Sequence, residues 1–252
     1  MADNLASFKV FCQGGLNTSR DVLSQGETQP GSAISLINYE PAVTGGYRKI
    51  NGFSNDYGTV TGTGKVLGVC VANGVNDGIL ACRAPSSGSD YLHYWDTGTQ
   101  SWIAVTTSGS PTMTGVTKVR FTKYNWGSPK VLLTDGINPA ATYDGTTYTQ
   151  ITHADAPSAP KFSHVFKNHL FLAGDPSEPT NLYFSAPYDE TDFSSASGAN
   201  VINVGFPIVA IKSFRDVLYI FGTNNIRKLA GNNISDFVLQ EVTDDLGCLA
   251  SD

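Results

Sequence analysis

The sequence predicts an all-β fold, a β-propeller-like array of four-stranded blades that follows an N-terminal extended β segment. The first observation behind this prediction is a repeat. FKNHLFLAG at 166–174 and FRDVLYIFG at 214–222 align without a gap, 48 residues apart. Earlier strand and turn patterns of the same form recur every 40–50 residues or so, a period typical of propeller blades. No segment of useful length shows the periodicity of a helix.

Residues 1–64 lie outside this repeat and are predicted to form a separate strand or platform segment. A Gly/Pro turn is expected at Pro30 and Gly31. Ile34 and Leu36 follow with period-two spacing, which predicts a strand there.

The first predicted blade spans about 65–110 and contains two hairpins. VLGVCVANGVNDGILACR at 66–83 reads as strand, Asn/Gly turn and strand. YWDTGTQSWIAV at 94–105 reads as a second hairpin, with Gly98 available for the positive φ of its turn. Trp95 and Trp102 flank that turn and could either stack on a sugar or pack one blade onto the next.

The later blades are predicted at about 116–155, 161–205 and 207–245. TYDGTTYTQI at 142–151 places Tyr143 and Tyr148 where the first blade has its tryptophans, which favours blade packing for all four rings. The repeated apolar strands should be buried at equivalent places in adjacent blades. The residues expected there are Leu170, Leu172, Leu218 and Ile220.

Composition excludes some classes of function. Charged residues make up 15% of the chain, below the roughly 25% usual for soluble domains, while 26 glycines indicate many turns. The net charge of −6 argues against a general nucleic-acid binder held by phosphate neutralisation. No basic stretch precedes an apolar core at the N-terminus, and no apolar run approaches ~18 residues, so we expect neither secretion nor membrane insertion.

No catalytic, cofactor-binding or metal-binding residues are predicted. The cysteines at 12, 70, 82 and 248 have no zinc spacing. Cys70 and Cys82 could face each other across a turn at Asn76–Gly78, either as a disulfide or, as the absent secretory signal favours, as free core thiols. Asp189, Glu190 and Asp192 could serve as glycosidase carboxylates or calcium ligands, but their surroundings favour a solvated loop.

Six stretches share a pattern with one known group of proteins: the Gly-Gly-Leu opening at 14–16, the strand around Asn38, the GYRKINGF close at 46–53, KNHLFLAG, SAPYDETDF and VTDDLGCLA. In these stretches the sequence resembles the nozzle proteins of short-tailed phages, the tail tubular protein B type, and the related DNA-stabilising tail proteins. The resemblance implies a structural virion protein at the tail or neck, made in the host cytoplasm. It also implies a ring, of six copies, that contacts an adaptor or other tail proteins and conducts DNA without sequence-specific binding.

We expect the assembly contacts outside the repeat, at Gln13, Asn17 and Arg20 and in the long loop with Asp189, Glu190 and Asp192. The acidic balance predicts a neutral-to-acidic conduit lining, which would let DNA slide rather than hold it. Two alternatives stay open. One is a propeller lectin or glycosidase acting on host surface glycans, and the other is an interaction propeller with no viral role.

Overall fold

The computed structural model describes residues 14–19, 31–42, 46–52, 56–84, 91–109, 111 and 113–250. The chain divides into two compact units, Met1–Asp56 and Tyr57–Asp252. Both are built from strands, and the described helical segments are two short 3-10 turns, η1 (Asn76–Gly78) and η2 (Ser195–Ser197). The all-β prediction is therefore confirmed.

The N-terminal unit contains one hairpin of β1 (Tyr39–Pro41) and β2 (Tyr47–Lys49). The Tyr47 hydroxyl donates to the Gly15 carbonyl at 2.9 Å, which fastens this hairpin to the preceding described segment. The strand predicted around Ile34 and Leu36 is wrong, since the backbone there is irregular. Ile34 is half exposed, so its spacing does not mark the buried face of a sheet.

The first sheet of the second unit is a four-stranded antiparallel meander. Its strands are β3 (Val66–Val71), β4 (Ile79–Arg83), β5 (Leu92–Asp96) and β6 (Ser101–Ala104). The turn between β5 and β6 forms as predicted, with the Asp96 carboxylate accepting the Gly98 N–H at 2.9 Å and the Thr99 hydroxyl at 2.8 Å. The positive φ falls on Gln100, at 51°, rather than on Gly98.

Three further sheets follow along the chain. The second has the order β7-β11-β10-β9-β8, with β7 parallel to β11, so 106–107 pair with the second sheet although they lie in the predicted first blade. Its strands are β7 (Thr106–Thr107), β8 (Arg120–Asn125), β9 (Pro129–Thr134), β10 (Ala141–Tyr143) and β11 (Thr147–Gln150). The third sheet holds β12 (Phe162–Phe166), β13 (His169–Ala173), β14 (Asn181–Phe184) and β15 (Asn200–Asn203). The fourth holds β16 (Ala210–Phe214), β17 (Val217–Phe221), β18 (Ile226–Ala230) and β19 (Val238–Thr243).

The aligned stretches of sequence form matching hairpins. β12 and β13 begin 48 residues before β16 and β17, respectively. Both turns place two non-glycine residues at positive φ, Lys167 and Asn168 at 48° and 63°, and Arg215 and Asp216 at 48° and 61°. Two consecutive residues of this kind define the type I′ turn, whose twist matches the twist of the flanking strands.

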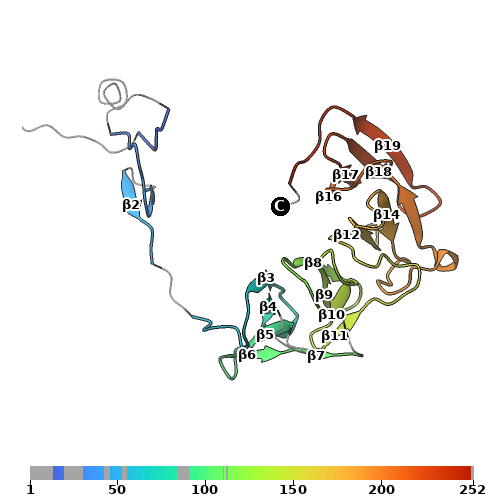
Figure 1. The fold of residues 1–252 in the computed structure, drawn as a ribbon, viewed down its shortest axis with the longest axis horizontal. Coiled ribbons are helices and arrows are strands. Elements are labelled where there is room, and N and C mark those ends of the chain that lie inside the picture. The colour runs from blue at the N-terminus through green and yellow to red at the C-terminus, as the bar shows by residue number, and fades with distance from the viewer. Residues whose placement is uncertain are drawn as a thin grey trace, which may run out of the picture. The chain divides into compact units, whose positions relative to one another are not determined.

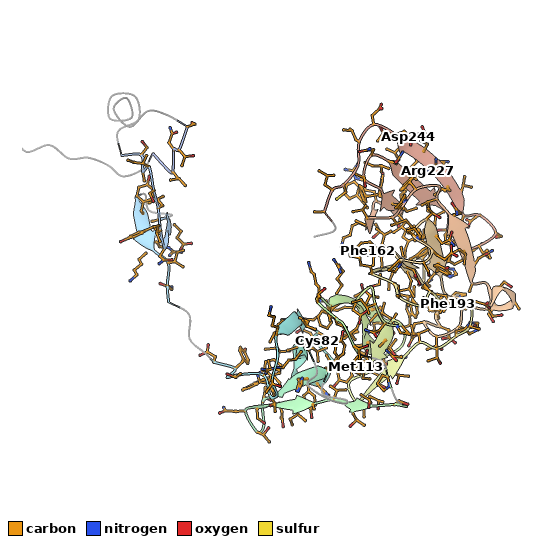
Figure 2. All side chains as sticks on the ribbon, in the orientation of Figure 1. Cys82, Met113, Phe162, Phe193, Arg227 and Asp244 are labelled. Atoms are coloured by element: carbon orange, nitrogen blue, oxygen red, sulfur yellow. The ribbon has the colours of Figure 1, made fainter. Side chains whose placement is uncertain are left out.

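Consecutive sheets pack face to face, so one buried cluster lies between each pair. Leu170 and Leu172 of β13 join a cluster with Leu132 of the second sheet. Leu218 and Ile220 of β17 join a cluster with aromatic rings of the third sheet. All four repeat residues have 0% exposure, which confirms the burial predicted for them. The sheets of this unit follow one another in chain order (Figure 1), and side chains fill the spaces between them (Figure 2).

Replacing Leu218 by Ala should lower the free energy of unfolding by about 2–5 kcal/mol, because it leaves a cavity between the third and fourth sheets. Urea denaturation measures this loss. Leu249→Ala is the matched control, since Leu249 is 88% exposed, and it should cost less than about 0.5 kcal/mol. Equal losses in the two variants would contradict the packing described for β17.

Candidate functional site

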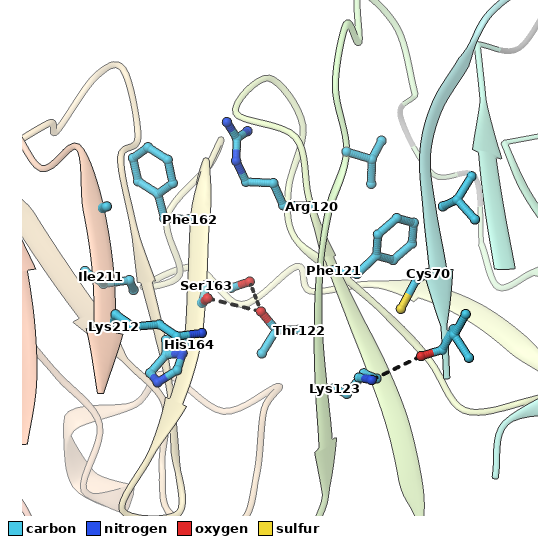
Figure 3. Close-up of a pocket in the computed structure, with 14 residues that line it drawn as sticks. Cys70, Arg120, Phe121, Thr122, Lys123, Phe162, Ser163, His164, Ile211 and Lys212 are labelled. Atoms are coloured by element: carbon cyan, nitrogen blue, oxygen red, sulfur yellow. Dashed lines mark hydrogen bonds between the residues drawn. The ribbon is translucent and has the colours of Figure 1, made fainter. Parts of the chain in front are cut away.

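A groove of about 790 Å³ runs across the strands that begin the repeated hairpins. It is lined by residues of β3, β8, β12 and β16, here called the inner strands, together with the residue before β8 (Figure 3). Each inner strand is the edge of its own sheet. Because the sheets pack face to face, these edges meet side by side and leave a hollow between them.

Side chains connect neighbouring inner strands across the groove. Lys123 of β8 donates from Nζ to the carbonyl of Val71 in β3 at 3.1 Å. Thr122 Oγ1 lies 2.7 Å from Ser163 Oγ of β12 (Figure 3). The inner strands are therefore held in fixed positions although they belong to different sheets.

The third connection fixes the protonation state of a histidine. The backbone N–H of Ser213 in β16 donates to Nε2 of His164 in β12 at 3.1 Å, so that nitrogen carries no proton. Burial, with the nearby Lys212 cation, lowers the pKa of His164 to about 4. His164 is thus neutral at pH 7 and contributes an acceptor rather than a charge.

The groove is cationic. Arg120, Lys123 and Lys212 line it, and none of its fourteen lining residues is Asp or Glu. The Arg120 guanidinium lies over the Phe162 ring, 5.3 Å from its centroid, a cation–π geometry that orients the side chain. This groove therefore has the charge opposite to the neutral-to-acidic lining that the composition predicts for a conduit.

The carboxylates of the long loop have separate structural roles. Glu190 is 5% exposed and accepts a hydrogen bond from Lys130 Nζ at 2.6 Å, so the prediction of a solvated loop is wrong at this residue. The pKa of Tyr124 is raised by burial and by the charge of Glu190. Phe193 of the same loop is buried in the cluster with Leu132. Glu190 and Phe193 thus anchor this segment to the second sheet, while Asp189 and Thr191 stay exposed.

Asp189 and Asp192 hold turns within the loop. Asp189 is exposed and accepts the Thr191 N–H at 2.9 Å. Asp192 accepts the Ser194 N–H at 2.7 Å, and hydrogen bonds from serines together with the nearby His153 lower its pKa. Since both carboxylates accept local hydrogen bonds, they stabilise the backbone of the loop.

The N-terminal assembly residues fall in a different unit. Asn17 accepts the Ser19 N–H at 3.2 Å in a local turn. Gln13 and Arg20 lie outside the described residues. The structure therefore places Asn17 in a turn and gives no geometry for its two predicted companions.

The predicted packing rings contact two different neighbours. Trp95 and Trp102 lie edge to face, with centroids 5.6 Å apart, and Trp95 meets the Tyr57 ring at 5.2 Å. Trp102 also donates from Nε1 to the Tyr57 carbonyl at 2.7 Å. Tyr143 and Tyr148 lie in the buried cluster shared by the first and second sheets. The tryptophans thus hold the segment before β3, while the tyrosines lie between sheets.

The described cysteines Cys70, Cys82 and Cys248 are free thiols, which confirms the free-thiol alternative for the first two. Cys70 lies opposite Leu80 and Cys82 opposite Gly68, so the two thiols are not cross-strand partners. Burial raises the pKa of Cys82. Among the described residues, no cluster of three or more His, Cys, Asp or Glu could hold a metal ion.

Sequence reasoning missed the groove residues Arg120, Lys123, His164 and Lys212. Each lies on the strand that precedes a repeated apolar strand, so a comparison of those preceding strands could have found them. In the described part of the chain, no helix is long and apolar enough to cross a bilayer. Comparisons with protein-family models and with curated proteins gave no match to this sequence.

Replacing Glu190 by Ala should lower the free energy of unfolding by about 1–3 kcal/mol, because Lys130 is left partly buried without its partner. Urea denaturation measures the loss, and limited proteolysis of the loop should become faster. Asp189→Ala, which removes only a local turn, should cost about 0.5 kcal/mol or less. A loop that is truly solvated would give the same small loss for both variants.

Replacing His164 by Asn should change how stability depends on pH. The folded pKa of about 4 lies below the unfolded value of about 6.5, so the unfolded chain binds more protons between these limits. The neutral His164 therefore contributes its full stabilisation to the wild-type fold above about pH 6.5, and this contribution is lost as the pH falls to about 4. The stability difference between the two proteins should shrink across that window. If urea denaturation gives the same difference in unfolding free energy between the two proteins at every pH, this prediction is contradicted.

Proposed function

We propose that this chain is a structural component of a phage virion, part of a ring-shaped nozzle at the tail or neck that retains and conducts DNA during ejection. In this proposal the four sheets are blades of a β-propeller-like array, and six copies form the ring against an adaptor or other tail proteins. The repeat of matching hairpins supports the array. The resemblance of the quoted segments to nozzle proteins supports the virion role.

The observation that carries the assembly proposal is the outer face of the fourth sheet, which points away from the third. This face includes Phe214, Val217, Tyr219 and Phe221, with Lys212 and Lys228 opposite Tyr219 on either side. The equivalent residues of the third sheet, 48 positions earlier, are Phe166, His169, Phe171 and Ala173. Those equivalents are at most 5% exposed, whereas Phe214 is 60% exposed and the other three are half-buried.

The comparison of these two faces indicates a contact. The third sheet buries its aromatic face under Leu218 and Ile220 of the fourth. The fourth sheet likewise carries rings on its equivalent face, at Phe214, Tyr219 and Phe221, but it places Lys212 and Lys228 beside them and leaves the face partly open to solvent. A second copy of the chain that covers this face would form a heterologous contact, and repetition of such a contact gives a ring when the rotation between copies closes. We propose this face as an assembly surface in addition to the exposed part of the long loop at Asp189.

The alternative function, a lectin or glycosidase for host glycans, would need exposed rings and paired carboxylates that converge in one central pocket. The groove offers neither feature among its lining residues. Its Phe162 ring is 6% exposed and lies beneath the Arg120 and Lys161 cations. We therefore favour the structural function.

Replacing Phe214 by Asp should prevent ring formation, since a charge would be buried in the contact. Light scattering and negative-stain electron microscopy of the purified chain should show rings for the wild type and monomers for the variant. Ile234→Asp is the matched control, because Ile234 is 40% exposed on the loop before β19, and it should assemble normally. Circular dichroism should show that both variants keep the β fold. A wild-type chain that stays monomeric at high concentration, or a Phe214 variant that forms rings, would refute the assembly proposal.

A further inference from the structure

Charge is distributed unevenly between the groove and the rest of the chain. The whole sequence has 22 acidic and 16 basic residues, a net charge of −6. The groove lining includes three cations and no carboxylate. Because all three charges have the same sign, an anion that enters this hollow is attracted by each of them.

The cations surround the groove rather than gather on one strand. The β12 strand packs between β8 and β16. Arg120 comes from β8 and Lys212 from β16, so a ligand that lies along β12 meets a cation on each side (Figure 3). Lys123 adds a third charge, and its ammonium keeps further N–H donors after its bond to the Val71 carbonyl.

The walls and the size of the groove suit a small ligand. Val69, Phe121 and Phe162 line it beside the cations, and apolar walls strengthen the attraction between opposite charges. The volume of about 790 Å³ lies within the range of roughly 300–1,000 Å³ for small-molecule sites. A guanidinium and ammonium groups both bind phosphate, sulfate and carboxylate oxygens through charge-assisted hydrogen bonds.

We propose that this groove is a binding site for a small polyanion, a molecule with two or more phosphate, sulfate or carboxylate groups. Arg120 and Lys212 bind separate anionic groups from opposite sides of β12, and Lys123 supports the end of the groove next to β3. A single small anion reaches fewer of these cations and binds more weakly. The site lies within one chain and needs no second copy, although its Lys212 is opposite Tyr219 at the edge of the proposed assembly face.

Isothermal titration of the full chain with tripolyphosphate at low salt tests the site. We expect saturable binding of one ligand per chain, with orthophosphate at least about tenfold weaker. Lys212→Gln and Arg120→Gln should each weaken tripolyphosphate binding by about tenfold, the change expected for loss of one charge-assisted contact. Lys228→Gln, which removes the same charge from β18 of the fourth sheet outside the groove, should change it less than about twofold.

Arg120 packs on Phe162, so its replacement could also disturb the fold. Lys212 is exposed, and circular dichroism should show that Lys212→Gln keeps the fold. The Lys212 variant therefore decides the test. Competition by a sulfated disaccharide or by a polyglutamate peptide then distinguishes sulfate and carboxylate sources from phosphate. Absence of saturable binding would overturn the proposal. So would unchanged binding by the Lys212 variant, or an equal loss in the Lys228 control, which would indicate unspecific attraction.

Discussion

The burial of the second strands β9 and β13 between two sheets each is the constraint on which the rest of the second unit depends. In β13, Leu170 and Leu172 pack on the second sheet while Phe171 packs toward the fourth. A strand covered on both faces is largely apolar, which explains why its segment does not alternate with polar residues. Its buried polar residue, His169, has the Ser185 carbonyl 2.6 Å from its Nδ1. Each such side chain contributes about 1.5–3 kcal/mol on burial, so the sheets stabilise one another as a series.

The groove follows from the same packing. Because successive sheets meet by their faces, their first strands come together by their edges and cannot continue one hydrogen-bonded ladder. Side-chain contacts such as Thr122 with Ser163, and the bond from Ser213 to His164, take the place of that ladder. The inner strands therefore carry polar residues at these contacts. The cations Arg120 and Lys212 lie on the same strands and line the hollow.

The parts of the fold that the sequence predicts are those set by local pattern. The two aligned hairpins and the buried Leu218 follow from short apolar runs and turns of fixed length.

The predictions that failed have non-local causes. Glu190 is buried because Lys130, 60 residues earlier, lies opposite it, and neither residue signals this pairing in its own segment. The groove is missed for the same reason, since its cations come from separate sheets. Gln100 takes the positive φ that local rules assign to Gly98, because the Asp96 side chain sets the turn.

The two ends of the sheet series differ, and the difference bears on the proposed assembly. At the first sheet, the chain covers part of its own outer face, since Trp102 and Arg83 donate to the carbonyls of Tyr57 and Val60, while Val69 and Val71 of β3 stay exposed there. At the fourth sheet, Phe214 stays exposed on the outer face. The two ends present different surfaces, a partly covered one and an aromatic one, so two copies would join through unlike surfaces. Such a contact is directional, and a directional contact that repeats is what a closed ring of identical subunits requires.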